Sequence, residues 1–221
     1  MTMQALFVYA HPEPTSFTAA LKDTGVAALR GKGYAVEVSD LYAENFCPVA
    51  GRHDFGGVAN AGRFDYQAEQ ARAHAALDFA PDIAREQARF LKAGLVVWLF
   101  PIWWGGMPAI MKGWFDRVLA YGFAYADGGR FDTGLFPAKR GLLCLSTGGT
   151  RERFSASGVY GDIRTVLWPA QRLMIEYLGM EALDPFVAYG VPRVDDEVRR
   201  TYLEEWRRHV LDVAEATVAK G

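Results

Sequence analysis

The feature that most constrains the fold of this chain is the alternation of short, fully apolar runs with longer amphipathic ones. Residues 5–10, 95–100 and 141–146 are apolar on both faces, which is typical of strands buried in the middle of a parallel sheet. Residues 34–39 alternate apolar and polar side chains, and this pattern indicates a strand nearer an edge. Residues 182–189 supply a further apolar run. The chain therefore carries five predicted strands.

Amphipathic windows separate these runs and predict connecting helices. They cover residues 17–30, 82–92, 109–119, 162–178 and 195–219. Pro169 falls inside the fourth window and is expected to kink that helix or divide it in two. Strands joined by right-handed helical crossovers form a doubly wound, three-layer α/β sandwich. We expect its five parallel strands in the order 2-1-3-4-5.

Residues 46–80 interrupt this alternation. They contain several glycines and no strong period, which predicts a long surface insertion with a short helix near residues 68–76. A chain of 221 residues with 51% hydrophobic content has the size and composition of one globular domain. We therefore expect residues 1–221 to form a single domain that carries this insertion.

Charge and composition exclude several classes of protein. The 24 Lys and Arg residues nearly balance the 26 Asp and Glu residues, and they form no basic block, so nucleic acid is not an expected partner. Cys47 and Cys144 lie far apart and match no metal or redox spacing, and the four histidines form no ligand cluster. We expect no bound metal and a reducing, cytoplasmic setting. No apolar stretch approaches the ~20 residues that span a bilayer, so no integral membrane segment is expected.

In an open parallel sheet, ligands bind beyond the carboxyl ends of the strands. The loop after the first strand, residues 11–18, contains no glycine and so lacks the glycine-rich dinucleotide and Walker fingerprints. Its hydroxyl groups precede a predicted helix, whose first N–H groups and dipole favour a phosphate. The alternative is that Thr15 or Ser16 is only a helix N-cap.

The loops after the third and fourth strands suit a planar ligand. Trp103 and Trp104 are followed by two glycines, so that an indole can form a wall while backbone N–H groups approach ring heteroatoms. Residues 147–150 (TGGT) offer a second close approach. Read singly, the tryptophans could fill a core or a subunit interface and the glycines could form a plain turn. Together with the phosphate loop, the three loops predict a bound flavin.

The chain resembles the flavin-dependent NAD(P)H:quinone oxidoreductases of DT-diaphorase type along nearly its whole length. The resemblance is carried by the motifs VYAHPEPTSFTAALK, SDLYAENFCP, FPIWWGGMPAIMKGWFDRVLAYGFAY, STGGT and SASGVYGDIRTVLWP. It implies a flavodoxin-like fold and a homodimer with a flavin at each of two sites on the subunit interface. It also implies that NAD(P)H and a quinone use one pocket in turn.

The resemblance also implies roles for individual residues. Those that would bind the flavin are His11, Ser16, Phe17, Thr18, Ile102, Trp103, Trp104, Gly105, Ser146, Thr147, Gly148, Gly149, Phe154 and Arg199. Those that would contact the substrate are Trp104, Tyr125, Phe154, Tyr160 and Tyr177. Tyr160, Gly148 and Gly149 would take part in catalysis. Arg199 falls where the family places an arginine near the adenine, which favours FAD over FMN. In the alternative reading, Phe17 is a core anchor, Arg199 is a solvated charge, and Tyr125 and Tyr177 are packed aromatic surface.

The chain departs from the mammalian enzymes beside the flavin, where Phe154 and Tyr160 replace a tyrosine and a histidine. A histidine can become cationic near neutral pH, whereas a phenol with an ordinary pKa of ~10 only donates a hydrogen bond. We therefore expect Tyr160 to donate to the reduced ring and Arg151 or Arg153 to supply the positive charge. Asp127 replaces a second pocket aromatic residue, and Asp65 replaces an amide.

The sequence thus predicts a two-electron reduction of quinones by NADH or NADPH through a bound flavin, with the two substrates reacting alternately. One alternative is an azo- or nitroaromatic reductase, because such a pocket selects for planarity. Another is a flavin-binding ancillary subunit of an ion-efflux system. A one-electron carrier is disfavoured, since such proteins tend to be strongly acidic and the net charge here is only -2.

Overall fold

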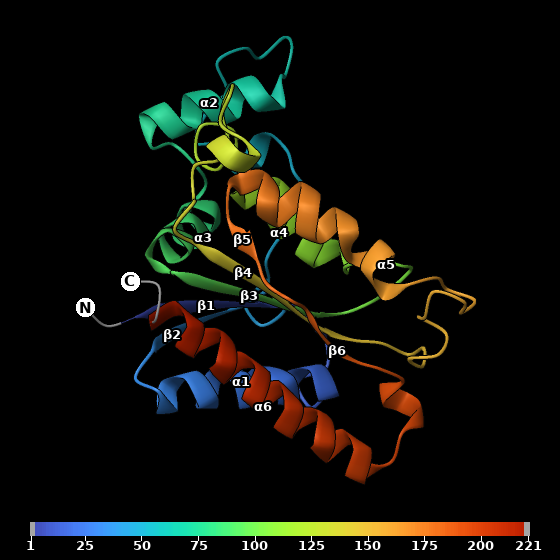
Figure 1. Cartoon of the computed structure of the whole chain (residues 1–221). Coiled ribbons are helices and arrows are strands. Elements are labelled where there is room, and N and C mark those ends of the chain that lie inside the picture. The colour runs from blue at the N-terminus through green and yellow to red at the C-terminus, as the bar shows by residue number, and fades with distance from the viewer. Residues whose placement is uncertain (1–2, 219–221) are drawn as a thin grey trace.

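The computed structural model describes residues 3–218, which form a parallel sheet between two layers of helices (Figure 1). The strands are β1 (Gln4–Tyr9), β2 (Ala35–Asp40), β3 (Leu95–Pro101), β4 (Arg140–Ser146), β5 (Glu181–Ala182) and β6 (Phe186–Ala188). They lie in the order β2-β1-β3-β4-β5, and β6 also pairs with β4. All these pairings are parallel. The predicted doubly wound α/β fold is confirmed.

Helices cover both faces of the sheet (Figure 1). One face carries α1 (Phe17–Gly31) and α6 (Asp196–Val218), and the other carries α3 (Pro81–Lys92), α4 (Ala109–Val118) and α5 (Ile163–Ala170). Alternate side chains of β1 enter the two cores: Leu6 and Val8 pack with α3, α4 and α5, whereas Phe7 packs with α1 and α6. Residue 219, the predicted end of the last helix, lies outside the described residues. None of the helices described within residues 3–218 is long and apolar enough to cross a membrane.

The prediction of one continuous strand over residues 182–189 is wrong. The strand is divided into β5, which pairs with Arg140 and Gly141, and β6, which pairs with the end of β4. Pro185 lies between them, and its missing N–H cannot donate to the neighbouring strand.

The prediction that Pro169 divides a helix is confirmed. Regular α-helix ends at Ala170, and the chain continues as a wider helical turn, Gln171–Ile175, and then a tighter one, Glu176–Leu178. Proline removes one intrahelical hydrogen bond and crowds the preceding turn, and the regular helix ends one residue after it.

Residues 46–80 carry the predicted helix as α2 (Tyr66–Ala76), but their first part is tied closely to the body of the protein. The loop at Pro48 crosses α4 where Gly113 lies, and a Cβ atom at Gly113 would stand 2.2 Å from the Pro48 carbonyl oxygen. Glycine is therefore needed at this crossing. One turn later, Arg117 of α4 faces the same loop.

Arg117 is the centre of a buried ionic cluster. Its side chain is 1% exposed, and its Nη2 and Nη1 atoms lie 2.8 Å from Asp54 Oδ1 and Asp82 Oδ2 respectively. Nη1 also donates to the Cys47 carbonyl at 2.7 Å. The Tyr66 hydroxyl donates to Asp54 at 2.6 Å; burial and this bond to a carboxylate raise the pKa of Tyr66. The cluster therefore joins the insertion to both α3 and α4.

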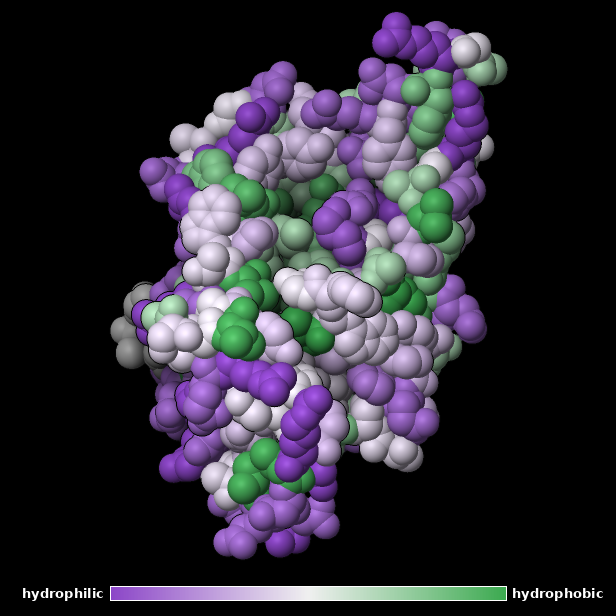
Figure 2. Space-filling model, turned by 90° about the vertical axis from the view of Figure 1, so that its right-hand side faces the viewer, coloured by the Kyte–Doolittle hydropathy of each residue, from purple (hydrophilic) through white to green (hydrophobic). Residues whose placement is uncertain are grey.

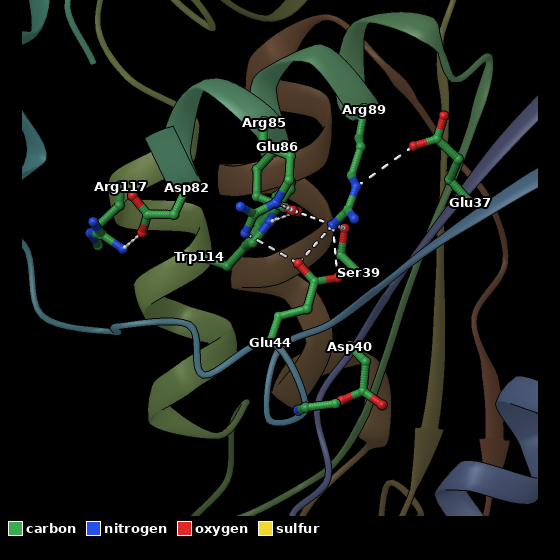
Figure 3. A network of polar contacts seen from close by, with 11 residues as sticks. Glu37, Ser39, Asp40, Glu44, Asp82, Arg85, Glu86, Arg89, Trp114 and Arg117 are labelled. Carbon is green, nitrogen blue, oxygen red and sulfur yellow. Dashed lines mark hydrogen bonds and ion pairs between the residues drawn. The ribbon is translucent and has the colours of Figure 1, made fainter. Parts of the chain in front are cut away.

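A second polar network joins α3 to α4 and to the turn after β2 (Figure 3). The buried Glu86 carboxylate accepts a hydrogen bond from Trp114 Nε1 at 2.8 Å and lies 2.6 Å from Arg89 Nη1. The same Arg89 nitrogen lies 2.9 Å from Glu44 Oε1. The network therefore fixes the start of the loop that leads to the insertion.

We expect Arg117→Leu to lower the free energy of unfolding by about 3–5 kcal/mol, because it leaves the fully buried Asp54 carboxylate without its cation. Urea denaturation followed by circular dichroism measures this loss. The matched control on the same helix is Lys112→Met, which removes a half-exposed pair with Asp116 and should cost at most about 1 kcal/mol. Similar losses for the two variants would contradict the buried role of Arg117.

Candidate functional site

The loops that follow β1, β3 and β4 meet at one edge of the sheet. The Ile102 backbone N–H donates to the Ser146 carbonyl at 2.9 Å, which joins the second loop to the end of β4. The Thr18 and Ser146 hydroxyl oxygens lie 2.9 Å apart, which joins the first turn of α1 to the same point. The three loops therefore surround one position, as parallel strand order requires.

The first loop ends in a capped helix. Ser16 is the N-cap of α1, and its hydroxyl accepts from the Ala19 N–H at 3.1 Å. Since the first N–H groups of a helix lack intrahelical partners, those of Phe17 and Thr18 are left for a ligand. The Phe17 ring packs partly against the core beside α1. The His11 imidazole lies at the edge of the Trp103 ring, with 6.2 Å between ring centroids.

The second loop is a two-residue turn that presents an indole to solvent. Trp103 and Gly106 exchange backbone hydrogen bonds of 2.9 and 3.0 Å, and Trp104 and Gly105 between them have φ values of 49° and 73°. Two successive left-handed residues define a type I′ turn, which favours glycine or asparagine at both positions. A fully exposed tryptophan in this conformation costs free energy and is typical of a functional surface.

The third loop is covered by two aromatic rings. A Cβ atom at Gly149 would stand 2.8 Å from the Phe154 ring and 2.9 Å from the Tyr160 ring, so only glycine allows both rings to lie there. The Thr147 hydroxyl donates to the Gly149 carbonyl at 2.6 Å. Arg153 Nη1 donates to the Tyr160 hydroxyl at 3.3 Å. Arg151 instead lies over the Tyr189 ring, so Arg153 is the cation beside Tyr160.

Two arginines near the start of α6 support this loop. Arg199 donates from Nε and Nη2 to the Val191 carbonyl at 3.3 and 3.2 Å, and the Val191 N–H donates to the Thr147 carbonyl at 3.0 Å. Arg193 donates to the Gly148 carbonyl. Arg193 is not recognisable as a site residue from the sequence, because a single basic residue after a strand carries no signal of its own.

Two neighbouring cavities have volumes of about 580 and 300 Å³, and of these two the smaller is the one that is lined by residues of these loops. Lys112 and Met174 line both cavities. Tyr125 and Tyr177 line the larger one, with ring centroids 5.7 Å apart, and Ile102 and the two loop glycines line the smaller one. Figure 2 views the molecule from the carboxyl ends of the strands and shows a hollow edged by apolar surface.

One chain does not bring all the predicted substrate residues together. Phe154 and Tyr160 lie before α5, and the Phe154 carbonyl accepts from the Ile163 N–H at its start. Tyr177 lies in the last helical turn, Glu176–Leu178. About fourteen residues of helical chain separate these points, which corresponds to about 20 Å. The two aromatic pairs are therefore at opposite ends of this helical segment (Figure 1).

The remaining departures from the family have local roles. The Asp65 carboxylate is the N-cap of α2 and accepts from the Ala68 N–H at 3.0 Å. Asp127 is exposed and lies 3.8 Å from Arg130. Among the described residues, no group of three His, Cys, Asp or Glu side chains converges as metal ligands would.

Comparison with known proteins agrees with this arrangement. A family model of the flavodoxin-like fold matches residues 3–210. The chain is 39% identical over 215 residues to NAD(P)H dehydrogenase (quinone) 1 of Cavia porcellus, covering 97% of this chain and 78% of the relative. It is 40% identical over 211 residues to ribosyldihydronicotinamide dehydrogenase (quinone) of Mus musculus, covering 95% and 91%.

A solved structure of a Klebsiella pneumoniae protein described as a quinone reductase superposes with a TM-score of 0.92 at 35% identity, covering 96% of this chain and 85% of that one. Fold, motifs and coverage therefore agree along most of the sequence. The chain belongs to the NAD(P)H:quinone oxidoreductase family of flavodoxin-like proteins.

Proposed function

We propose that this protein reduces quinones to hydroquinones with NADH or NADPH, using one flavin site for both substrates in turn. The observation that carries the proposal is the meeting of a capped helix end, an exposed tryptophan turn and a glycine loop at one edge of the sheet. In the balanced reaction, one NAD(P)H and one proton convert a quinone into a hydroquinone and NAD(P)⁺.

The residues present fit a flavin. The free N–H groups of Phe17 and Thr18, at the positive end of the α1 dipole, would hold its phosphates. Cβ atoms at Gly105 and Gly106 would meet nothing within 4 Å, so their backbone is open to a planar ring. The chemistry that a bound flavin supplies is the acceptance of a hydride and the later transfer of two electrons to a quinone.

The cofactor we propose is FAD. Arg199 fastens the turn at Val191 to the Thr147 loop, and its partly exposed guanidinium would lie beside the adenine end of the cofactor. We also propose that the protein works in the cytoplasm, since its two cysteines are free thiols and such thiols persist in reducing compartments.

Tyr160 and Arg153 would stabilise charge that develops on the ring. Because Arg153 donates to the Tyr160 oxygen, the hydroxyl hydrogen is free to point away from the guanidinium and towards a ligand over Gly149. A hydrogen bond that strengthens as negative charge develops lowers the barrier. The guanidinium adds a permanent positive charge beside the ring.

We further propose a homodimer in which Tyr125 and Tyr177 of one subunit cover the flavin ring of the other. The proposal is supported by the separation of the two aromatic pairs along α5. It is also supported by exposed apolar side chains on this segment, Trp168 at 54% and Leu173 at 49% exposure, since large exposed apolar surface favours association.

The purified protein should be yellow and should release FAD on denaturation. It should also oxidise NADH or NADPH steadily when benzoquinone is supplied. Absorbance spectra, chromatography of the released flavin and the decrease in nicotinamide absorbance measure these properties. Protein that stays colourless with both FAD and FMN would contradict the site. Flavin binding without turnover would favour the ancillary-subunit alternative, and faster turnover of azo or nitro compounds than of quinones would favour the reductase alternative.

Tyr160→Phe should slow reduction of the bound flavin by NAD(P)H about tenfold or more, because one hydrogen bond to the transition state is lost. Stopped-flow absorbance at the flavin band measures this rate. The control is Tyr34→Phe, which removes a hydroxyl bonded to the Ala214 carbonyl away from the site and should leave the rate unchanged. An unchanged rate in Tyr160→Phe would remove this hydroxyl from the mechanism.

The protein should sediment at twice its chain mass of 24.5 kDa. Leu173→Glu should convert it to monomers and abolish quinone turnover, because a charge at a buried interface costs several kcal/mol. Leu91→Glu, at a site on α3 that is 55% exposed, should change neither property. A wild-type monomer with full turnover would overturn the shared-site proposal.

A further inference from the structure

A cationic group lies against the aromatic pair that lines the larger cavity. The Arg130 guanidinium lies over the Tyr177 ring at 5.8 Å from its centroid, within the range of a cation–π contact. Tyr177 in turn contacts Tyr125 and Phe131, with ring centroids 5.7 and 5.3 Å away. The positive charge therefore lies against a ring that lines this cavity.

The backbone around Arg130 holds that position. The Arg130 N–H donates to the Thr133 hydroxyl at 3.2 Å, and the same hydroxyl lies 2.9 Å from the Arg130 carbonyl. Phe131, the next residue, has a left-handed φ of 52°, a conformation that costs free energy outside glycine. These contacts fix the direction in which the Arg130 side chain leaves the backbone.

The ion pairs near the cavity differ in how fully the two charges of each pair compensate each other. Asp127 lies 3.8 Å from Arg130, but its side chain is 87% exposed against 46% for Arg130. A well-hydrated carboxylate is screened more strongly than a guanidinium held on aromatic rings. In the cavity wall, Lys112 and Asp116 are 48% and 47% exposed and lie 2.5 Å apart, so they largely compensate each other. The Arg130 charge is therefore the less compensated one beside Tyr177.

The field of Arg130 also reaches Tyr125. Burial raises the pKa of the Tyr125 hydroxyl, and Arg130 opposes that rise because it stabilises the phenolate. A negatively charged ligand beside Tyr125 would gain from the same field.

We propose that Arg130 makes the protein select planar electron acceptors that carry a negative charge, such as sulfonated or carboxylated quinones. The inference rests on the proposed function, because it assigns the cavity lined by Tyr125 and Tyr177 to the acceptor. The anionic group is bound and not transformed, so the balance of the reaction is unchanged.

The test compares kcat/KM for 1,4-naphthoquinone-2-sulfonate and for neutral 2-methyl-1,4-naphthoquinone, with NADH as donor. The ratio of the two values is compared between variants, so that the different potentials of the two quinones cancel. Arg130→Gln should lower the ratio about fivefold and Asp127→Asn should raise it about two- to threefold, as loss of a positive or a negative neighbour requires. Added salt should reduce these differences.

The matched control is Arg172→Gln. Arg172 is 47% exposed, is paired with Glu176 and lies over the same Phe131 ring at 4.3 Å, but it lines a separate groove with Asp132 and Gly179. Its substitution should leave the ratio within twofold of the wild type. An equal ratio in Arg130→Gln and wild type, or an equal fall in Arg172→Gln, would overturn the selection by Arg130.

A binding measurement separates this inference from the proposed function. Isothermal titration with naphthalene-2-sulfonate and its neutral isostere naphthalene-2-sulfonamide requires no turnover. The wild type should bind the sulfonate more tightly by about fivefold, and Arg130→Gln should lose this preference. If neither quinone is reduced, the proposed function fails, and the titration alone decides whether Arg130 selects anions. No preference in the wild type would overturn the inference.

Discussion

The position of residues 46–80 against α3 and α4 depends on the guanidinium of Arg117, whose side chain is only 1% exposed. Arg117 ties together the loop at Cys47, the carboxylate of Asp54 and the start of α3 at Asp82. Burying the Arg117 cation and the Asp54 carboxylate is costly, and the cost is offset only when each finds its partners. The insertion therefore has one favoured position on α4, and it carries with it Ala50, Tyr66 and Gln70, which form one wall of the larger cavity.

The insertion is also connected to the aromatic residues that line the larger cavity. The Gln70 side chain accepts from the Tyr121 N–H at 3.1 Å, which connects α2 to the loop that contains Tyr125. The insertion, residues 46–80, thus helps to position the Tyr125 and Tyr177 rings. The loops after β1, β3 and β4 are positioned in another way, by the order of the strands and by backbone hydrogen bonds between neighbouring loops.

This difference explains what could be predicted from the sequence. The strands and the sheet order were predictable because runs such as residues 95–100 encode burial locally. The meeting of the three loops followed from that order. The pairing of Arg117 with Asp54, 63 residues away, was not predictable, because charge identity carries no information about distant partners. The division at Pro185 and the left-handed Trp104 were also missed, although the proline and the glycine after Trp104 are both visible in the sequence.

Adjacent glycines in the third loop show how unevenly such a site constrains its own sequence. A Cβ atom at Gly148 would make only an ordinary contact of 3.5 Å with Arg193 Nη1, whereas at Gly149 it would press into two rings. Among related sequences, position 148 should therefore tolerate other residues, whereas position 149 should remain glycine. Two identical letters in a motif can thus be subject to very different purifying selection.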